Sequence, residues 1–197
     1  ISPIINVILD DRAMTNDKNL KGPEIKGDDA DLSSIEMGFS LEEARDELIT
    51  AMKRVDLVIL NDGEIRMLAG EQNLILAGKI VQEMAGGPIL IIKRGEHGVT
   101  ALHREGIISI PAYPVIDLID PTGCGDSFAG AMTAHLAKGD GEISHTELME
   151  SLVHATVTAS FTLESFGTEA LRTISPGDYQ SRLIAYRALS NTRLSQE

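Results

Sequence analysis

Two short apolar runs separated by a helical pattern constrain the fold of this chain more than any other feature. Residues 55–60 (VDLVIL) and 88–93 (PILIIK) have the length and β-branched content of strands that are buried on both faces. Between them, residues 74–84 carry apolar side chains at helical spacing, and Gly86 and Gly87 end that helix. Two strands joined through a helix form a βαβ unit, so we expect them to lie parallel in one sheet.

The segments on either side extend this unit into an α/β chain. Ser40 and Glu43 have the spacing of a capping box at the start of a helix, and Gly167 is placed to cap the end of another. The further elements that we expect are a helix from Ser40 to near Arg54, a hairpin of strands 99–103 and 107–111, a helix after residue 126, a helix over 147–165 and a last helix after Pro176. This order predicts a three-layer α/β sandwich with a mostly parallel sheet and helices on both faces.

The N-terminal region does not fit this pattern. Residues 10–31 are acidic and show no sustained period of two or 3.6. We therefore divide the chain into residues 1–38, an irregular arm or the remnant of a region whose packing partner is absent, and residues 39–197, an α/β domain. Because the first residue is Ile1 rather than methionine, we expect the chain to be a fragment of a longer protein.

Charge and cysteine content narrow the possible partners. Seventeen basic and thirty acidic side chains give a formal charge of -13 and a pI of about 4.7, which opposes binding to nucleic acid or to an anionic membrane surface. The single cysteine, Cys124, cannot form an intrachain disulfide, and the apolar runs are too short to span a bilayer. No stretch has the pattern of a secretory signal. We therefore expect a cytoplasmic protein.

The glycine-rich loop at residues 120–126 (DPTGCGD) is the most informative local sequence. Two glycines and a small residue at a helix start expose backbone N–H groups where the helix dipole is positive, which suits a phosphate or another oxyanion. The loop is not a Walker A sequence, and Phe128 stands where a dinucleotide-binding loop has its third glycine. From the residues alone, an anion site and a tight turn that merely begins a helix are equally open.

Asp126 sharpens this choice. A carboxylate beside an anion site repels a bound phosphate, so its presence there is useful if it accepts a proton. The alternative is a first-turn aspartate that the helix dipole stabilises by roughly 0.3–1 kcal/mol.

The longer run from Asp120, DPTGCGDSFAGA, resembles the second signature of the ribokinase-like (PfkB) carbohydrate kinase family, which usually has Ala at the position of Cys124. The segment Asn61-Asp-Gly-Glu64 is similar to the Asn-x-x-Glu element of that family, and two glycines in the run 93–98 match its Thr-Leu-Gly-x-x-Gly pattern. The resemblance covers residues 55–167. It implies a ribokinase-like fold that is truncated on its N-terminal side, and it makes residues 39–197 a nucleotide-binding kinase domain.

The resemblance implies ATP-dependent phosphoryl transfer to a hydroxyl of a sugar or related small molecule. Asp126 would accept the proton of the attacking hydroxyl. Asn61 and Glu64 would hold phosphate and hydrated Mg²⁺, the latter through water. The amides implied in stabilising the transferring phosphoryl group are those of Gly123, Cys124 and Gly125.

The remaining implied contacts concern the nucleotide and a second cation. Gly95 and Gly98 would let the backbone approach the nucleotide. Lys93 would reach a phosphate or, as the last residue of a buried strand, extend to solvent. Thr156 would lie on the helix that contacts the adenine. The residues implied in holding a monovalent cation, K⁺, are Asp120, Thr122 and Gly167.

Two alternatives stay open beside the kinase interpretation. The first is a fragment or scaffold that binds nucleotide without turnover, because the region that contacts the sugar in the family has no counterpart here. The second is thiol chemistry, since Cys124 lies at a helix start where a thiolate is favoured. As partners we expect a sugar or nucleoside acceptor and a second copy in a homodimer, and neither nucleic acid nor a membrane.

Overall fold

The structure, a computed structural model, describes residues 7–9, 41–139 and 142–190. In chain order the elements are β1 (Val7–Leu9), α1 (Leu41–Met52), β2 (Leu57–Asn61), α2 (Asp62–Ala69), α3 (Leu74–Met84), β3 (Ile89–Lys93), the 3-10 helix η2 (Gly95–His97), β4 (Val99–His103), β5 (Gly106–Ile110), α4 (Cys124–Leu136), α5 (His145–Thr162), α6 (Glu169–Thr173) and α7 (Pro176–Ser190). The described helices include none with the length and apolarity to cross a membrane.

The described strands form one five-stranded sheet in chain order, β1-β2-β3-β4-β5. β1, β2 and β3 are parallel, and β4 and β5 follow as an antiparallel hairpin. The expected βαβ unit is confirmed, with α2 and α3 in the connection between β2 and β3. The sheet is thus mixed, parallel in its β1–β3 half and antiparallel beyond β3, where the sequence predicted the hairpin.

β1 is a strand that the sequence pattern did not predict. Its residues 7–9 pair in parallel with residues 57–59 of β2, although they fall within the expected irregular arm, 1–38. Three residues are too few to show an apolar period, and the pairing partner lies far along the chain. The rest of the expected arm and the expected cap Ser40 lie outside the described residues, so the domain boundary stays a prediction.

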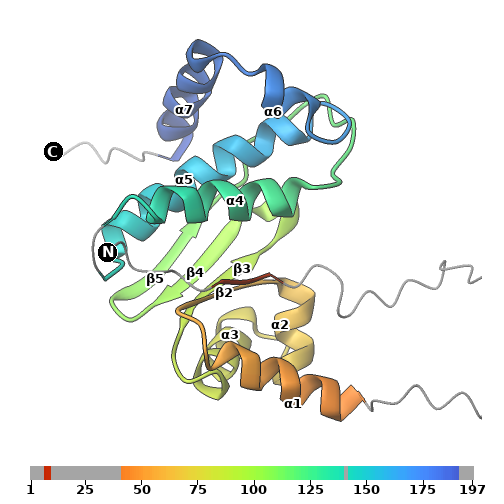
Figure 1. Cartoon of the computed structure of the whole chain (residues 1–197), viewed down its shortest axis with the longest axis vertical. Coiled ribbons are helices and arrows are strands. Elements are labelled where there is room, and N and C mark those ends of the chain that lie inside the picture. The colour runs from red at the N-terminus through yellow and green to blue at the C-terminus, as the bar shows by residue number, and fades with distance from the viewer. Residues whose placement is uncertain (1–6, 10–40, 140–141, 191–197) are drawn as a thin grey trace, which may run out of the picture.

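Helices cover both faces of this sheet (Figure 1). α1, α2 and α3 lie on one face, α4 and α5 lie on the other, and α7 packs on the outer side of α5. β2 divides the core between the faces, because successive side chains of a strand point to opposite sides. Val58 and Leu60 join the cluster under α1–α3, and Leu57 and Ile59 join the cluster under α4 and α5. The predicted three-layer α/β sandwich is confirmed.

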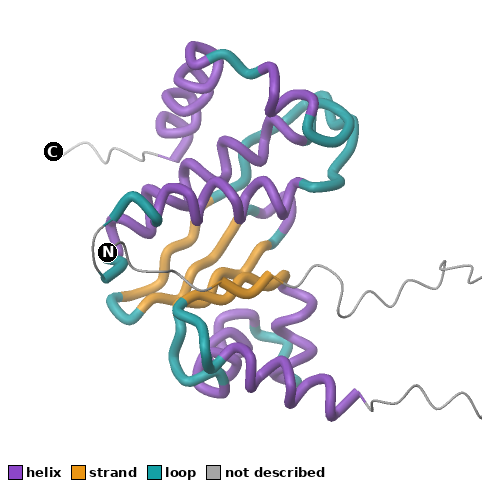
Figure 2. Tube along the Cα trace, in the orientation of Figure 1, coloured by secondary structure: helices purple, strands orange, loops and turns teal. Residues whose placement is uncertain are grey.

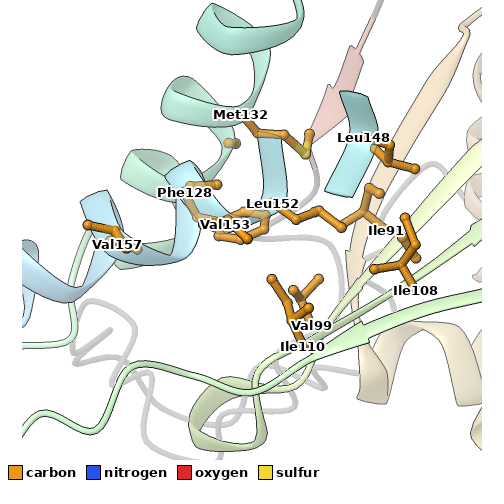
Figure 3. Close-up of a cluster of buried hydrophobic side chains, with 14 of the residues drawn as sticks. Ile91, Val99, Ile108, Ile110, Phe128, Met132, Leu148, Leu152, Val153 and Val157 are labelled. Atoms are coloured by element: carbon orange, nitrogen blue, oxygen red, sulfur yellow. The ribbon is translucent and has the colours of Figure 1, made fainter. Parts of the chain in front are cut away.

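The cluster under α4 and α5 holds these helices on the sheet (Figure 3). Phe128 and Met132 of α4 and Leu152 of α5 pack with Ile91 and Ile108 of the sheet, and all five side chains are buried. This packing fixes the position of the first turn of α4, where the glycine-rich loop ends.

The end of α5 differs from the prediction. The helix spans His145–Thr162 rather than 147–165, and its C-terminal cap is Leu163. Gly167 is therefore not the helix cap, and that expectation is wrong. The carbonyl of Leu163 accepts a hydrogen bond from the N–H of Ile119 at 2.8 Å, a contact between distant segments that a local pattern does not reveal. Gly167 instead lies in a left-handed turn (φ 59°) before α6.

The connection between β5 and α4 is a long irregular segment (Figure 2). It contains the apolar run 115–119, in which the relative exposure of Ile116 is 94% and that of Leu118 is 60%. The segment delivers the chain from the hairpin to the glycine-rich loop.

Candidate active site

The carboxyl ends of β2 and β3 and the first turns of α2 and α4 lie at one edge of the sheet (Figure 1). β2 ends at Asn61 and β3 ends at Lys93. These two residues lie opposite each other in the parallel register of the two strands. The positive charge of Lys93 acts on the thiol of Cys124 in the first turn of α4. Since open α/β sheets gather ligands at the carboxyl ends of their strands, the structure brings these predicted site residues to the expected place.

Asn61 and Glu64 form a reciprocal pair at the start of α2. The side-chain oxygen of Asn61 accepts the N–H of Glu64 at 2.8 Å, and the Glu64 carboxylate accepts the N–H of Asn61 at 2.7 Å. The Glu64 side chain is buried, with 6% relative exposure. This capping box satisfies two backbone donors without any ligand, and it also holds the Glu64 carboxylate in one orientation.

The Gly95–Gly98 turn follows β3 directly. The N–H of Arg94 donates to the Gly98 carbonyl at 2.8 Å, which closes the turn around η2. Both glycines have positive φ, 55° at Gly95 and 87° at Gly98, a conformation that other residues adopt only with strain. The turn thus has no side chain at its first and last positions, while Glu96 and His97 between them are exposed.

The N-terminus of α4 has a glycine where side-chain caps usually stand. Gly123 is the N-cap residue, with φ 79° and no side chain to bond the first turn. The Cys124 amide donates to the Pro121 carbonyl at 3.2 Å, so one of the three amides that we expected to converge on an anion is used within the loop. The amides of Gly123 and Gly125 have no hydrogen-bond partner among the described residues. Two of the three expected donors therefore remain at this helix N-terminus.

Asp126 lies in the first turn of α4, exposed to solvent. Its carboxylate has no hydrogen-bond or ion-pair partner within the described part of the chain. An exposed first-turn carboxylate is stabilised by the helix dipole, and it is also free to accept a proton from a ligand. Its role as a proton acceptor beside the glycine amides stays a prediction.

The thiol of Cys124 is directed away from such chemistry. It is half-buried against α5 and donates to the Ala159 carbonyl at 3.8 Å. Burial raises the pKa of the Cys124 thiol, and the charge of Lys93 only partly opposes this. A raised pKa leaves less thiolate at neutral pH, so the thiol alternative finds no support in the structure.

Two of the three residues expected to hold a monovalent cation form a local turn. The Asp120 carboxylate accepts the N–H of Thr122 at 2.9 Å, and hydrogen bonds from Thr122 lower the pKa of Asp120. The N–H of Asp120 points to the Leu163 carbonyl at 3.4 Å, so the loop adjoins the end of α5. Gly167 follows in the turn after that end, and the cation site stays a prediction.

Thr156 lies in the middle of α5 and not at the carboxyl edge of the sheet. Its side chain is buried, with 8% relative exposure, and lies close to the phenol of Tyr186 on α7. It is about one turn from Ala159, the carbonyl partner of Cys124. The structure places Thr156 behind the loop, so a contact of its side chain with adenine stays a prediction.

Ser127 and Thr162 support the glycine-rich loop and were missed in the sequence. The Ser127 hydroxyl donates to the Gly123 carbonyl at 2.9 Å, and the Thr162 hydroxyl donates to Ser127 at 2.8 Å. Ser127 directly follows Asp126 in the motif, which was an available signal. The Thr162 contact joins α4 to α5 and leaves no local trace in the sequence.

Clefts and metal ligands give little further guidance at this edge. In the described residues, no group of three or more His, Cys, Asp or Glu side chains is arranged to hold a metal ion. One cleft of about 550 Å³ lies at the opposite edge of the sheet, beside Val55 and Pro88, and another of about 490 Å³ lies between α5, α6 and α7.

Solved structures with a similar fold include several small-molecule kinases. Aminoimidazole riboside kinase from Salmonella enterica, complexed with aminoimidazole riboside and an ATP analog, superimposes with a TM-score of 0.64 at 22% identity, covering 74% of this chain and 48% of that one. Ribokinase from Thermotoga maritima gives a TM-score of 0.57 at 22% identity, over 69% and 44% of the two chains. These similarities define the fold as ribokinase-like.

The sequence comparison identifies the family. The sequence model described as pfkB family carbohydrate kinase matches residues 37–174, well over half of the chain. This protein belongs to the pfkB family of carbohydrate kinases, as its motifs predicted.

Comparison with curated relatives shows what fraction of their length this chain matches. Cytidine kinase from Thermococcus kodakarensis is 34% identical over 97 residues, which is 48% of this chain and 34% of that protein. Fructokinase from Klebsiella pneumoniae is 28% identical over 96 residues, which is 49% of this chain and 31% of that protein. The chain thus matches about a third of the length of these relatives.

Proposed function

We propose that this chain is the nucleotide-binding part of an ATP-dependent kinase that phosphorylates a hydroxyl of a sugar or nucleoside. The observation that carries the proposal is the open N-terminus of α4. There the exposed carboxylate of Asp126 adjoins the amides of Gly123 and Gly125, and none of these groups has a partner among the described residues. Relatives named as cytidine kinase and fructokinase support the acceptor class.

In the proposed reaction, the acceptor hydroxyl oxygen forms a bond to the γ-phosphorus of ATP. The bond from that phosphorus to the bridging oxygen breaks, and ADP leaves. The hydroxyl proton passes to the carboxylate of Asp126. The N–H groups of Gly123 and Gly125 stabilise negative charge on the transferring phosphoryl group. The Cys124 amide joins them only by exchanging its turn bond to Pro121.

Asn61 and Glu64 are the residues that would hold magnesium and phosphate. Their oxygen ligands suit Mg²⁺, which keeps most of its waters and takes few protein ligands. The buried Glu64 carboxylate is already oriented by the N–H of Asn61, so little ordering is needed on binding. Bound Mg²⁺ would neutralise charge on the ATP phosphates.

The nucleotide would lie along the same edge. Lys93 would meet a phosphate, because it ends β3 next to Asn61 and acts on the first turn of α4. The Gly95–Gly98 turn would contact the nucleotide through its backbone. Asp120, Thr122 and Gly167 would hold K⁺ beside the loop.

The second candidate function is nucleotide binding without turnover. The observation that favours it is the length of the chain, which matches about a third of its curated relatives.

An ADP-release assay on the intact protein separates the two candidates. The panel contains pentoses, hexoses, phosphosugars and nucleosides as acceptors, and ATP affinity is measured in parallel. We expect turnover with one acceptor class and a dissociation constant for ATP that can be measured. ATP binding with no turnover across the panel would favour the second candidate, and the absence of both would contradict the proposal.

A further inference from the structure

Tyr186 of α7 occupies a fully buried position. Its hydroxyl donates to the Pro111 carbonyl at 2.6 Å, and the side chain of Thr156 on α5 lies close to the same phenol. Burial raises the pKa of Tyr186 to about 12. The phenol therefore remains a hydrogen-bond donor at any pH near neutrality.

The Pro111 peptide is also where the Gly95–Gly98 turn packs. A Cβ atom added at Gly98 would lie 2.6 Å from the carbonyl carbon of Pro111 and 2.7 Å from the nitrogen of Ala112. Only glycine allows the two backbones to approach this closely, and Gly98 also has φ 87°. Gly98, which we expect near the nucleotide, is thus linked to Tyr186 through Pro111.

The same peptide begins the irregular segment that leads to the glycine-rich loop. At its far end, the N–H of Ile119 donates to the Leu163 carbonyl at 2.8 Å. Between these points Ile116 is almost fully exposed, so contacts at the two ends, rather than burial of the middle, fix the course of the segment. α7 contributes a further contact near the first end, where the guanidinium of Arg182 lies 5.0 Å from the centre of the Tyr113 ring.

We propose that Tyr186 is a positioning residue for the nucleotide. Its hydrogen bond to Pro111 fixes the Gly95–Gly98 turn relative to the start of the segment that carries the loop 120–126. α7 thereby belongs to the nucleotide site without touching the nucleotide. This inference rests on the proposed function, because it assumes that ATP binds along this edge of the sheet.

The test compares two variants of α7 that each lose one phenol hydroxyl. Tyr186→Phe removes the bond to Pro111. Tyr179→Phe is the matched control, because the hydroxyl of Tyr179 bonds Nδ1 of His154 at 2.7 Å instead. ATP affinity, steady-state kinetics, melting temperature and hydrogen exchange are measured on the intact protein.

We expect Tyr186→Phe to weaken ATP binding by about three- to tenfold, the range that one lost neutral hydrogen bond produces. Turnover at saturating ATP should change by less than about twofold, because no group that touches the reacting atoms is altered. Hydrogen exchange should become faster in residues 95–98 and 112–119. Tyr179→Phe should leave ATP affinity and exchange in these residues unchanged, even where it lowers the melting temperature as much.

The outcomes separate the inference from the proposed function. If both variants bind ATP as the unmodified protein does, or if both weaken binding in proportion to lost stability, Tyr186 has no positioning role and the proposed function stands. If the unmodified protein binds no ATP, the proposed function fails, and the positioning role fails with it.

Discussion

α2 and α4 both begin at the carboxyl edge of the sheet, yet only the first turn of α2 is closed by its own side chains. Asn61 and Glu64 bond each other's backbone N–H groups across the start of α2. At the start of α4 the cap is Gly123, and the amides of Gly123 and Gly125 have no partner within the described residues. Backbone donors that the protein does not satisfy are available to an anion. We infer that α4 is the helix that receives the transferring phosphoryl group.

The largest expected effect on turnover comes from replacing the first-turn carboxylate of α4, and the first-turn carboxylate of α2 provides the comparison. Asp126→Asn should lower turnover of the intact enzyme by roughly 10²–10⁴, the usual contribution of a general base, and should leave ATP affinity within a few-fold. Asp62→Asn is the matched control, because Asp62 lies in the first turn of α2 and pairs with Arg66. Steady-state kinetics and melting temperature are measured on both.

Each change removes a carboxylate that the helix dipole stabilises, by roughly 0.3–1 kcal/mol. Both variants should therefore lose a small amount of stability, slightly more in Asp62→Asn because it also loses the charge pair with Arg66, while only Asp126→Asn loses turnover. Unchanged turnover with a lowered melting temperature in Asp126→Asn would leave that residue with a structural role alone.

A smaller effect, on stability, is expected when the side-chain cap at the N-terminus of α2 is removed. Asn61→Ala removes the cap of α2 and should cost about 1 kcal/mol of stability. Asn73→Ala should cost a similar amount, because the Asn73 side chain caps α3 by accepting the N–H of Leu76 at 3.0 Å. Urea unfolding compares the two losses of stability.

The same two variants also test whether Asn61 helps to bind magnesium and phosphate. With Mg²⁺ present, ATP affinity should fall in Asn61→Ala and stay unchanged in Asn73→Ala. Equal ATP affinity in the two variants would restrict Asn61 to helix capping.

The smallest effect concerns pH and the turn that precedes α4. Hydrogen bonds from Thr122 lower the pKa of the Asp120 carboxyl below its ordinary value of 3.8. The unfolded chain therefore takes up this proton first, and the stability that the turn contributes is present above pH 3.8 and lost as pH falls below it. Asp120→Asn keeps an acceptor oxygen but has no charge to titrate.

Melting temperatures between pH 5 and pH 3 measure this contribution. The unmodified protein should lose stability slightly more steeply than Asp120→Asn as the pH falls. Parallel curves for the two proteins would show that the Asp120 turn does not stabilise the loop.

Much of the fold could be predicted because it is local. The helix expected over 74–84 is α3 at the same bounds, and the strand expected at 99–103 is β4. Apolar periodicity and glycine stops specify such elements without reference to the rest of the chain. β1 was missed because three residues become a strand only through pairing with β2.

The motif residues of the candidate site could be predicted from the sequence, but the contacts that hold them in place could not. The sequence places Asp126 and the two glycines beside it in one turn. It does not show that the Cys124 amide is used within that turn. It also gives no sign that Tyr186 holds Pro111, because side-chain contacts between distant segments depend on how the helices pack.

The most direct test of the open N-terminus of α4 is a titration with ATP followed by the backbone amide signals in NMR spectra. We expect the amides of Gly123 and Gly125 to shift strongly with ATP and to respond far less to adenosine, which has the base and no phosphate. Amides of Gly123 and Gly125 that stay unmoved at saturating ATP, or that shift equally with adenosine, would contradict the account.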